Sequence, residues 1–210
     1  MRGIKTELAS KRKAAGAAVA AAVVVLAACA FVAQSGDKTE QVAAAPSPTP
    51  APPTCSTTTQ TFIPTSVSIP GVDTDITVLP LARESNGVPA TPPLTSLGKT
   101  EMAFDLGQKI LPGASQGNAL LNAHTWPDGS ALGNKLLDKL QKGDKIFVRG
   151  PLGKICYAVN DRVEVPAEKP NHRYFDKKGP AQIAIVVCSG QRLGPGIWTK
   201  RTLWFASPVA

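Results

Sequence analysis

Histidine is scarce in this sequence, which contains only His124 and His172 among its 210 residues. A zinc site needs clustered histidine or cysteine ligands, and no acidic cluster offers an alternative, so the sequence predicts neither a metal nor a cofactor. Blocks of Lys and Arg are also missing after residue 13. The formal charge of +8 falls to +5 over residues 62–210, where seventeen basic residues face twelve acidic ones. This modest excess of basic residues, without a cluster, does not indicate a surface that binds nucleic acid.

Charge and proline are both absent from residues 14–33, an Ala- and Val-rich run of twenty residues. As a helix it would span roughly 30 Å, about the thickness of a bilayer core. The basic tail 1–13 precedes it, so the positive-inside rule keeps that tail in the cytoplasm and exports everything after Gln34. We expect a single-pass anchor in the cell membrane. A lipobox ending at Cys29 and a cleaved signal peptide remain alternatives, and both also export the rest.

Bulky apolar residues are rare between residues 34 and 61, which are rich in Pro, Ala, Ser and Thr. Such a segment cannot bury enough surface to fold, so it is predicted to be a disordered, partly extended linker. The folded part then runs from Phe62 to Ala210 and is long enough for one sizeable core.

Short strand patterns dominate the folded part, and one convincing helix follows Ser130. Leu132, Leu136 and Leu140 recur at helical spacing there, and Ser130 can cap the start. The pattern predicts a mainly β protein, a closed or nearly closed barrel of about eight strands with one or two short helices and long loops. The predicted strands are 65–69, 75–79, 117–123, 145–148, 155–159, 163–165, 182–187 and 202–205.

Outside the predicted anchor the sequence contains an odd number of cysteines, namely Cys55, Cys156 and Cys188. At least one is therefore free or pairs between chains, and a leftover thiol in an exported protein is a candidate nucleophile. We expect Cys55 and Cys156 either to pair or to stay inert. Cys188 is predicted to stand at a strand end, because Ser189 and the glycine after it should stop the strand; a plain core cysteine is the alternative.

A cysteine nucleophile needs a base or an imidazolium partner and donors aimed at the developing oxyanion. His124 follows a strand pattern and should sit where the strand enters a loop, although a half-buried histidine bonded to backbone is the alternative. His172 is predicted to be a solvated loop residue. Arg201 lies in the next strand after Cys188 and would reach its end if the two strands are neighbours; Arg192 is the rival.

The folded part contains, in this order, the stretches GNALLNAH (117–124), IAIVVC (183–188) and GIWTKRTLWFA (196–206). These three stretches resemble those of sortases, the cysteine transpeptidases of Gram-positive cell surfaces. The resemblance covers residues 62–208, is nearest to class F with class E as runner-up, and implies the sortase barrel with His124, Cys188 and Arg201 in the catalytic positions. The threonine that usually precedes the cysteine is Val187 here.

The resemblance implies an anchored extracellular enzyme that cleaves an LPXTG-like signal of surface proteins. Cys188 would form a thioester, Arg201 would stabilise the oxyanion, and His124 would protonate the leaving amine. An amine of a cell-wall precursor would then resolve the thioester. A wall-associated binding or scaffolding domain without turnover is the alternative function.

Overall fold

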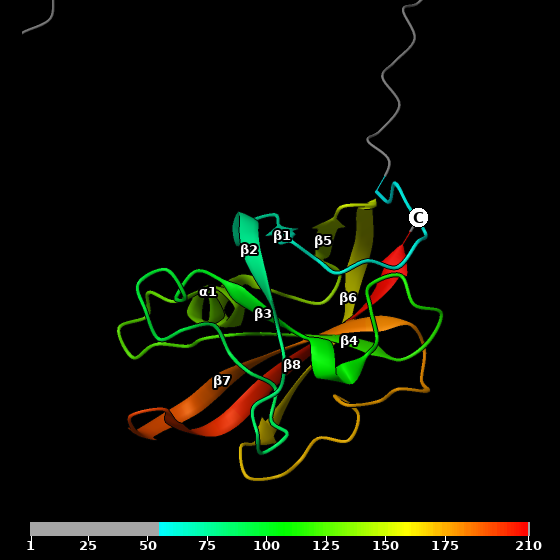
Figure 1. Cartoon of the computed structure of the whole chain (residues 1–210). Coiled ribbons are helices and arrows are strands. Elements are labelled where there is room, and N and C mark those ends of the chain that lie inside the picture. The colour runs from blue at the N-terminus through cyan, green and yellow to red at the C-terminus, as the bar shows by residue number, and fades with distance from the viewer. Residues whose placement is uncertain (1–54, 210) are drawn as a thin grey trace, which may run out of the picture. The chain divides into compact units, whose positions relative to one another are not determined.

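Eight strands of the computed structural model, which describes residues 55–209, close into one barrel (Figure 1). They follow the order β1-β2-β3-β4-β7-β8-β6-β5, and β1 pairs with β5 to complete the ring. The β2–β3 and β4–β7 pairs are parallel, and the other pairs are antiparallel. The strands are β1 Ser66–Ile69, β2 Asp73–Leu81, β3 Met102–Asp105, β4 Asn118–Ala123, β5 Lys145–Gly150, β6 Gly153–Pro166, β7 Gln182–Gly194 and β8 Ile197–Val209.

This architecture confirms the predicted mainly β barrel with long loops. Its helices are short: α1 spans Leu132–Lys139 and the 3-10 turn η1 spans Leu106–Gln108. No helix within residues 55–209 combines the length and apolar character needed to cross a bilayer. The predicted cytoplasmic tail and the anchor 14–33 lie outside the described residues.

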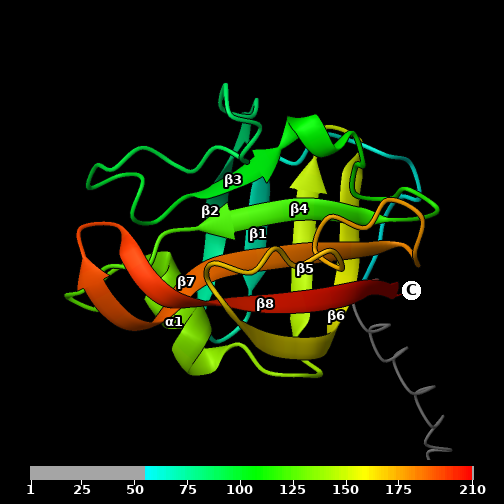
Figure 2. The ribbon, with the colours of Figure 1, turned by 90° about the horizontal axis from the view of Figure 1, so that it is seen from below.

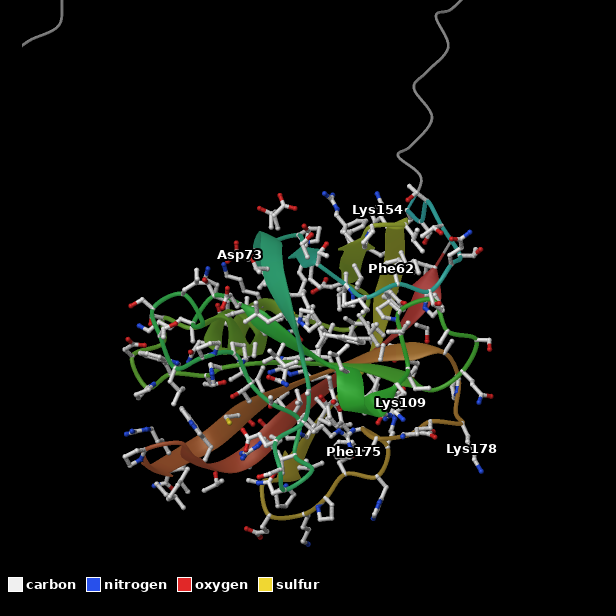
Figure 3. All side chains as sticks on the ribbon, in the orientation of Figure 1. Phe62, Asp73, Lys109, Lys154, Phe175 and Lys178 are labelled. Atoms are coloured by element: carbon white, nitrogen blue, oxygen red, sulfur yellow. A yellow bond between two sulfur atoms is a disulfide. The ribbon has the colours of Figure 1, made fainter. Side chains whose placement is uncertain are left out.

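Alternation along the strands divides apolar residues between the barrel interior and its outer surface, because successive side chains of a strand point to opposite faces. In β4, Ala119, Leu121 and Ala123 belong to the interior core, whereas Leu120 belongs to a second, smaller cluster. That outer cluster also contains Tyr174, from the segment between β6 and β7. Figure 3 shows Phe62, an interior residue, and Phe175, beside Tyr174, on opposite sides of β4 and β8.

Helix α1 packs into the barrel interior through Leu132 and Leu136, and Leu140 follows it into the same core. The indole nitrogen of buried Trp204 donates to the Leu140 carbonyl at 3.0 Å. The prediction that Ser130 caps this helix is wrong. Ala131 holds the N-cap position, and the Ser130 hydroxyl instead donates to Asp128 at 2.6 Å.

Two strand predictions also differ from the structure. The sequence does not predict strand β3, because four residues are too few to show an alternation of apolar and polar side chains. They form a strand through their pairing with β2 and β4. The two predicted strands 155–159 and 163–165 are parts of the single strand β6, whose pairing with β8 shifts register between Val159 and Asp161. This bulge breaks the alternation that a sequence pattern needs.

The segment before Phe62 is attached to the barrel from Cys55 at the latest. Cys55 forms a disulfide with Cys156 of β6, the Ser56 hydroxyl donates to Val209 O at 2.7 Å, and Thr57 N donates to Lys154 O at 2.8 Å. The last residues of the predicted linker 34–61, from Cys55 on, therefore belong to the folded part. A disulfide and backbone hydrogen bonds hold them on the barrel, although their composition does not predict folding.

Reducing this disulfide is expected to destabilise the barrel substantially. It closes a loop with a sequence separation of 101, and bridges across long loops contribute about 2–5 kcal/mol. Thermal unfolding should therefore shift down by roughly 5–15 °C in reductant. A Cys55→Ser, Cys156→Ser double variant should unfold at the lower temperature with or without reductant. A wild-type melting temperature that ignores reductant would contradict this expectation.

Candidate active site

Strand register places three of the predicted residues in one row across the outer face of the barrel. Cys188 of β7 pairs directly with Arg201 of β8, and Arg201 pairs on its other side with Val165 of β6. His124 immediately follows Ala123, which pairs with Val187, so it lies on the same side at the level of Cys188. The expectation that Arg201 sits beside Cys188 on a neighbouring strand is confirmed.

The thiol of Cys188 is half-buried, and among the described residues Cys188 is the cysteine outside a disulfide. Burial raises the pKa of this thiol, and the nearby Arg201 charge offsets part of that rise. Arg201 thus provides the electrostatic support that a thiolate needs in this partly dry position.

Two backbone carbonyls hold the Arg201 guanidinium. Its Nη1 donates to Lys200 O at 2.9 Å and to Trp198 O at 3.4 Å. Within residues 55–209, neither Nε nor Nη2 has a hydrogen-bond partner, and no carboxylate forms a salt bridge with this arginine. Two donor groups and an unneutralised charge therefore remain available to an anion beside the thiol.

The prediction that the strand stops directly after Cys188 is wrong. Strand β7 continues to Gly194 and forms a long hairpin with β8 that projects from the barrel (Figure 2). The pairing is irregular between Ser189 and Arg192, where Gly190 has φ +77°. The glycine therefore marks an interruption of the register rather than the end of the strand.

His124 sits where β4 enters a loop, as predicted, and is half-buried. Its Nε2 lies 2.6 Å from the carbonyl oxygen of Pro92. A carbonyl only accepts, so Nε2 carries a proton and Nδ1 is left to exchange one. The backbone bond of the alternative interpretation thus exists, and it orients an imidazole that lines the same pocket as Cys188.

Neighbouring residues fix the backbone of this row. The Thr125 hydroxyl donates to Cys188 O at 2.6 Å, which ties the end of β4 to β7. The Gly133 amide of α1 donates to His124 O at 2.8 Å, and a Cβ at Gly133 would lie 2.4 Å from that oxygen. Helix α1 can therefore approach the histidine this closely only because residue 133 is glycine.

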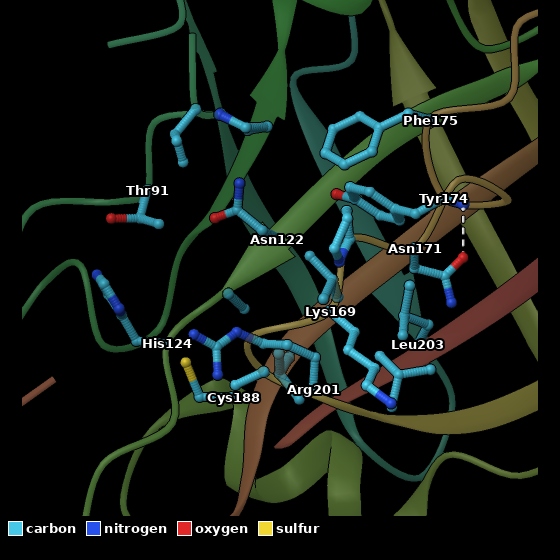
Figure 4. Close-up of a pocket in the computed structure, with 18 residues that line it drawn as sticks. Thr91, Asn122, His124, Lys169, Asn171, Tyr174, Phe175, Cys188, Arg201 and Leu203 are labelled. Carbon is cyan, nitrogen blue, oxygen red and sulfur yellow. Dashed lines mark hydrogen bonds between the residues drawn. The ribbon is translucent and has the colours of Figure 1, made fainter. Parts of the chain in front are cut away.

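His124, Cys188 and Arg201 line one pocket of about 360 Å³ and gather at one end of it in Figure 4. Its floor continues over Val186 and Leu203, the next row of the same face. Apolar residues predominate around it, so the cavity suits an extended chain with apolar side chains. The remaining lining residues are Val88, Pro89, Thr91, Asn122, Ala123, Val165, Ala167, Lys169, Pro170, Asn171, Tyr174, Phe175 and Val187.

The other candidates lie elsewhere. Arg192 pairs with Trp198 in the projecting hairpin and does not line the pocket, and His172 is exposed, as predicted. Sequence reasoning missed Asn122, although a polar residue two positions before His124 in an apolar strand marks the same face. It also missed Tyr174 and Thr91, which come from loops whose course the sequence does not reveal.

Alkylation of Cys188 is expected to require a higher pH than alkylation of an ordinary cysteine. Iodoacetamide reacts with the thiolate, and the raised pKa of this thiol moves the rate midpoint above the ordinary value of about 8.5. Arg201→Ala should move it further up, because the arginine charge lowers this pKa. Rates measured by mass spectrometry against pH, with the urea-unfolded chain as reference, test this. A folded-state midpoint below the unfolded one would contradict it.

Comparisons with known proteins find likeness at the level of structure. No family model matches the sequence, and no curated protein matches it. Sortase A of Listeria monocytogenes superposes with a TM-score of 0.51 at 19% identity, over 69% of this chain and 86% of that one. A lid mutant of sortase A from Corynebacterium diphtheriae gives 0.53 at 16% identity, over 72% of each chain, and sortase C1 from Streptococcus suis gives 0.52 at 19%, over 70% and 73%. The chain therefore has the sortase fold.

Proposed function

We propose that the protein is a sortase-type cysteine transpeptidase that acts on LPXTG-like signals of surface proteins. The observation that carries the proposal is the direct pairing of Cys188 with Arg201 in the pocket that His124 also lines. A thiol, a guanidinium with no carboxylate partner in the described part of the chain, and an imidazole on one row supply the nucleophile, the oxyanion donor and the proton carrier of acyl transfer.

In the first half of the reaction, the Cys188 thiolate attacks the carbonyl carbon of the scissile peptide bond. The free donors of Arg201 stabilise the resulting oxyanion, which then collapses to a thioester as the C–N bond breaks. His124, protonated on both nitrogens, gives its Nδ1 proton to the leaving amine. This step consumes one peptide bond and leaves the acyl chain on sulfur.

In the second half, an acceptor amine attacks the thioester carbonyl. His124 takes a proton from the attacking nitrogen, a new amide bond forms, and Cys188 leaves as the thiolate that began the cycle. We propose an amine of a cell-wall precursor as the natural acceptor. The apolar pocket floor of Val186 and Leu203 favours the peptide over bulk water next to the thioester.

We also propose that the catalytic domain is extracellular, tethered by residues 14–33 to the cell membrane. The basic tail followed by an uncharged run supports this orientation. The Cys55–Cys156 disulfide supports it independently, because such bonds persist in oxidising compartments outside the cytosol. Class F remains our preferred subdivision, on the sequence resemblance alone.

A ligation assay tests the proposal. The full-length protein in detergent is incubated with a library of LPXTG-like peptides and triglycine, and products are identified by mass spectrometry. We expect a peptide cleaved within its motif and joined to triglycine, with slower hydrolysis when the amine is omitted. Folded protein that binds a peptide without cleaving it would replace the proposal with the wall-associated binding domain.

A further inference from the structure

Two side chains at the end of β4 bind the loop between β2 and β3 to the active-site face. Asn122 lies within the strand, and His124 follows its last residue, Ala123, which places it two positions after Asn122 and therefore on the same face. The Asn122 amide nitrogen donates to Ala90 O at 2.9 Å, and His124 Nε2 lies 2.6 Å from Pro92 O. Two side chains at alternate positions thus bind two carbonyls at alternate positions, so that residues 90–92 run beside the end of β4.

These two bonds connect the middle of the loop to the barrel. Within residues 55–209, no other hydrogen bond joins residues 89–93 to a different element; Thr95 N, which donates to Pro93 O, belongs to the same loop. Pro89 and Thr91 also line the pocket, and Thr91 and Asn122 lie on the same side of it in Figure 4. The loop therefore forms a pocket wall whose position depends on Asn122 and His124.

Within the described residues, the side-chain amide of Asn122 forms a hydrogen bond through its nitrogen but not through its oxygen. The residue is only 5% exposed, and its Oδ1 is buried without a partner among the described residues. Exchanging the two amide ends would place an oxygen against the Ala90 carbonyl, so the observed orientation is the favourable one. A valine or leucine, like its row neighbours Val186 and Leu203, would leave no polar atom unpaired. The donor to Ala90 is what the asparagine adds at this position.

We propose that Asn122 is a positioning residue for His124. The hydrogen bond from Asn122 to Ala90 O fixes the position of the loop. The Pro92 carbonyl, two residues further along, then accepts from His124 Nε2 and keeps the imidazole proton on that nitrogen. The imidazole then presents Nδ1 for proton transfer in every turnover. This inference rests on the proposed transpeptidase function for its kinetic consequence, but the state of the imidazole is measurable without any substrate.

The test compares Asn122→Ala and Asn122→Asp with Asn160→Ala. Asn122→Asp keeps the shape and loses the donor, whereas Asn160 of β6 is the other asparagine with a buried unpaired Oδ1 in the described chain and lies outside the pocket. We expect both Asn122 variants to lower kcat for ligation by about ten- to a hundredfold, because a displaced catalytic group loses its alignment. Asn160→Ala should leave kcat unchanged.

Nitrogen-15 NMR of the imidazoles supplies the second readout. The chain has two histidines, and a His172→Gln variant assigns the signals. Wild-type His124 should show one tautomer with the proton on Nε2, and both Asn122 variants should show a mixture. An Asn122 variant that matches Asn160→Ala in kcat, or that loses kcat while keeping the single tautomer, would overturn the inference. Wild-type protein without ligation activity would refute the proposed function instead, with the tautomer comparison still deciding the role of Asn122.

Discussion

Replacing Cys188 with alanine is expected to abolish ligation, with a loss on the order of 10⁴-fold or more, because the pocket then lacks the thiol that carries the acyl chain. The same change should eliminate labelling by a substrate-like peptide vinyl sulfone, which reacts with the nucleophilic thiol. Ligation is followed by chromatography of the peptide product, and labelling by intact-protein mass.

The matched control is the Cys55→Ser, Cys156→Ser double variant. It removes the other two cysteines of the described chain, which form a disulfide between β6 and the segment before β1. We expect it to be labelled once, at Cys188, and to ligate at a temperature below its lowered melting point. Equal labelling of the Cys188→Ala variant and the wild type would show that the nucleophile has been misassigned.

Replacing Arg201 with alanine is expected to lower kcat by about 10²–10³-fold, the usual effect of removing one oxyanion donor. Two effects act together. The oxyanion loses its hydrogen-bond donors, and the pKa of Cys188 rises because the arginine charge that lowers it is gone. Arg201→Lys should recover only part of the rate, because lysine keeps the charge without the planar fork of donors. Initial ligation rates at saturating peptide measure both variants.

Arg192→Ala provides the control for Arg201, because it removes the same side chain from the same hairpin outside the pocket. Its ligation rate should match that of the wild type. A loss in Arg192→Ala as large as that in Arg201→Ala would mean that hairpin charge, and not a donor at the thiol, drives the reaction. In that case the pairing of Arg201 with Cys188 would not explain the rate of ligation.

Local sequence patterns predict much of the fold, because most strands show a recognisable apolar pattern within their own residues. The strand that leads into His124 shows the short apolar run 119–121, and the strand that contains Cys188 shows the longer run 183–187. Strand β3 carried no such signal, since four residues between a loop and a turn become a strand only through partners on both sides. The Ser130 prediction is wrong because the helix has Ala131 at its N-cap, and the Ser130 hydroxyl donates to Asp128 while its oxygen accepts from Lys99.

The candidate site was predictable where it depends on adjacent strands and unpredictable where it depends on loops. That Cys188 and Arg201 lie on neighbouring strands follows from the hairpin between them. Their direct pairing does not, because the register shifts between Ser189 and Arg192 and again between Arg192 and Gly194. The contact between His124 and Pro92 spans a separation of 32 residues and joins a strand to a loop without regular structure. No periodicity encodes such an approach, so the partners of His124 had to come from the structure.

Trapping the acyl-enzyme shows whether Cys188 carries the acyl chain during the reaction. Full-length protein is mixed with a peptide that it ligates, without an added amine, quenched in acid, and analysed by intact mass and then by peptide mapping. We expect a mass increase equal to the peptide fragment before the scissile bond, located on Cys188 and removed by triglycine or hydroxylamine. An adduct on any other residue, or product formation without any adduct on Cys188 under conditions that slow deacylation, would contradict it.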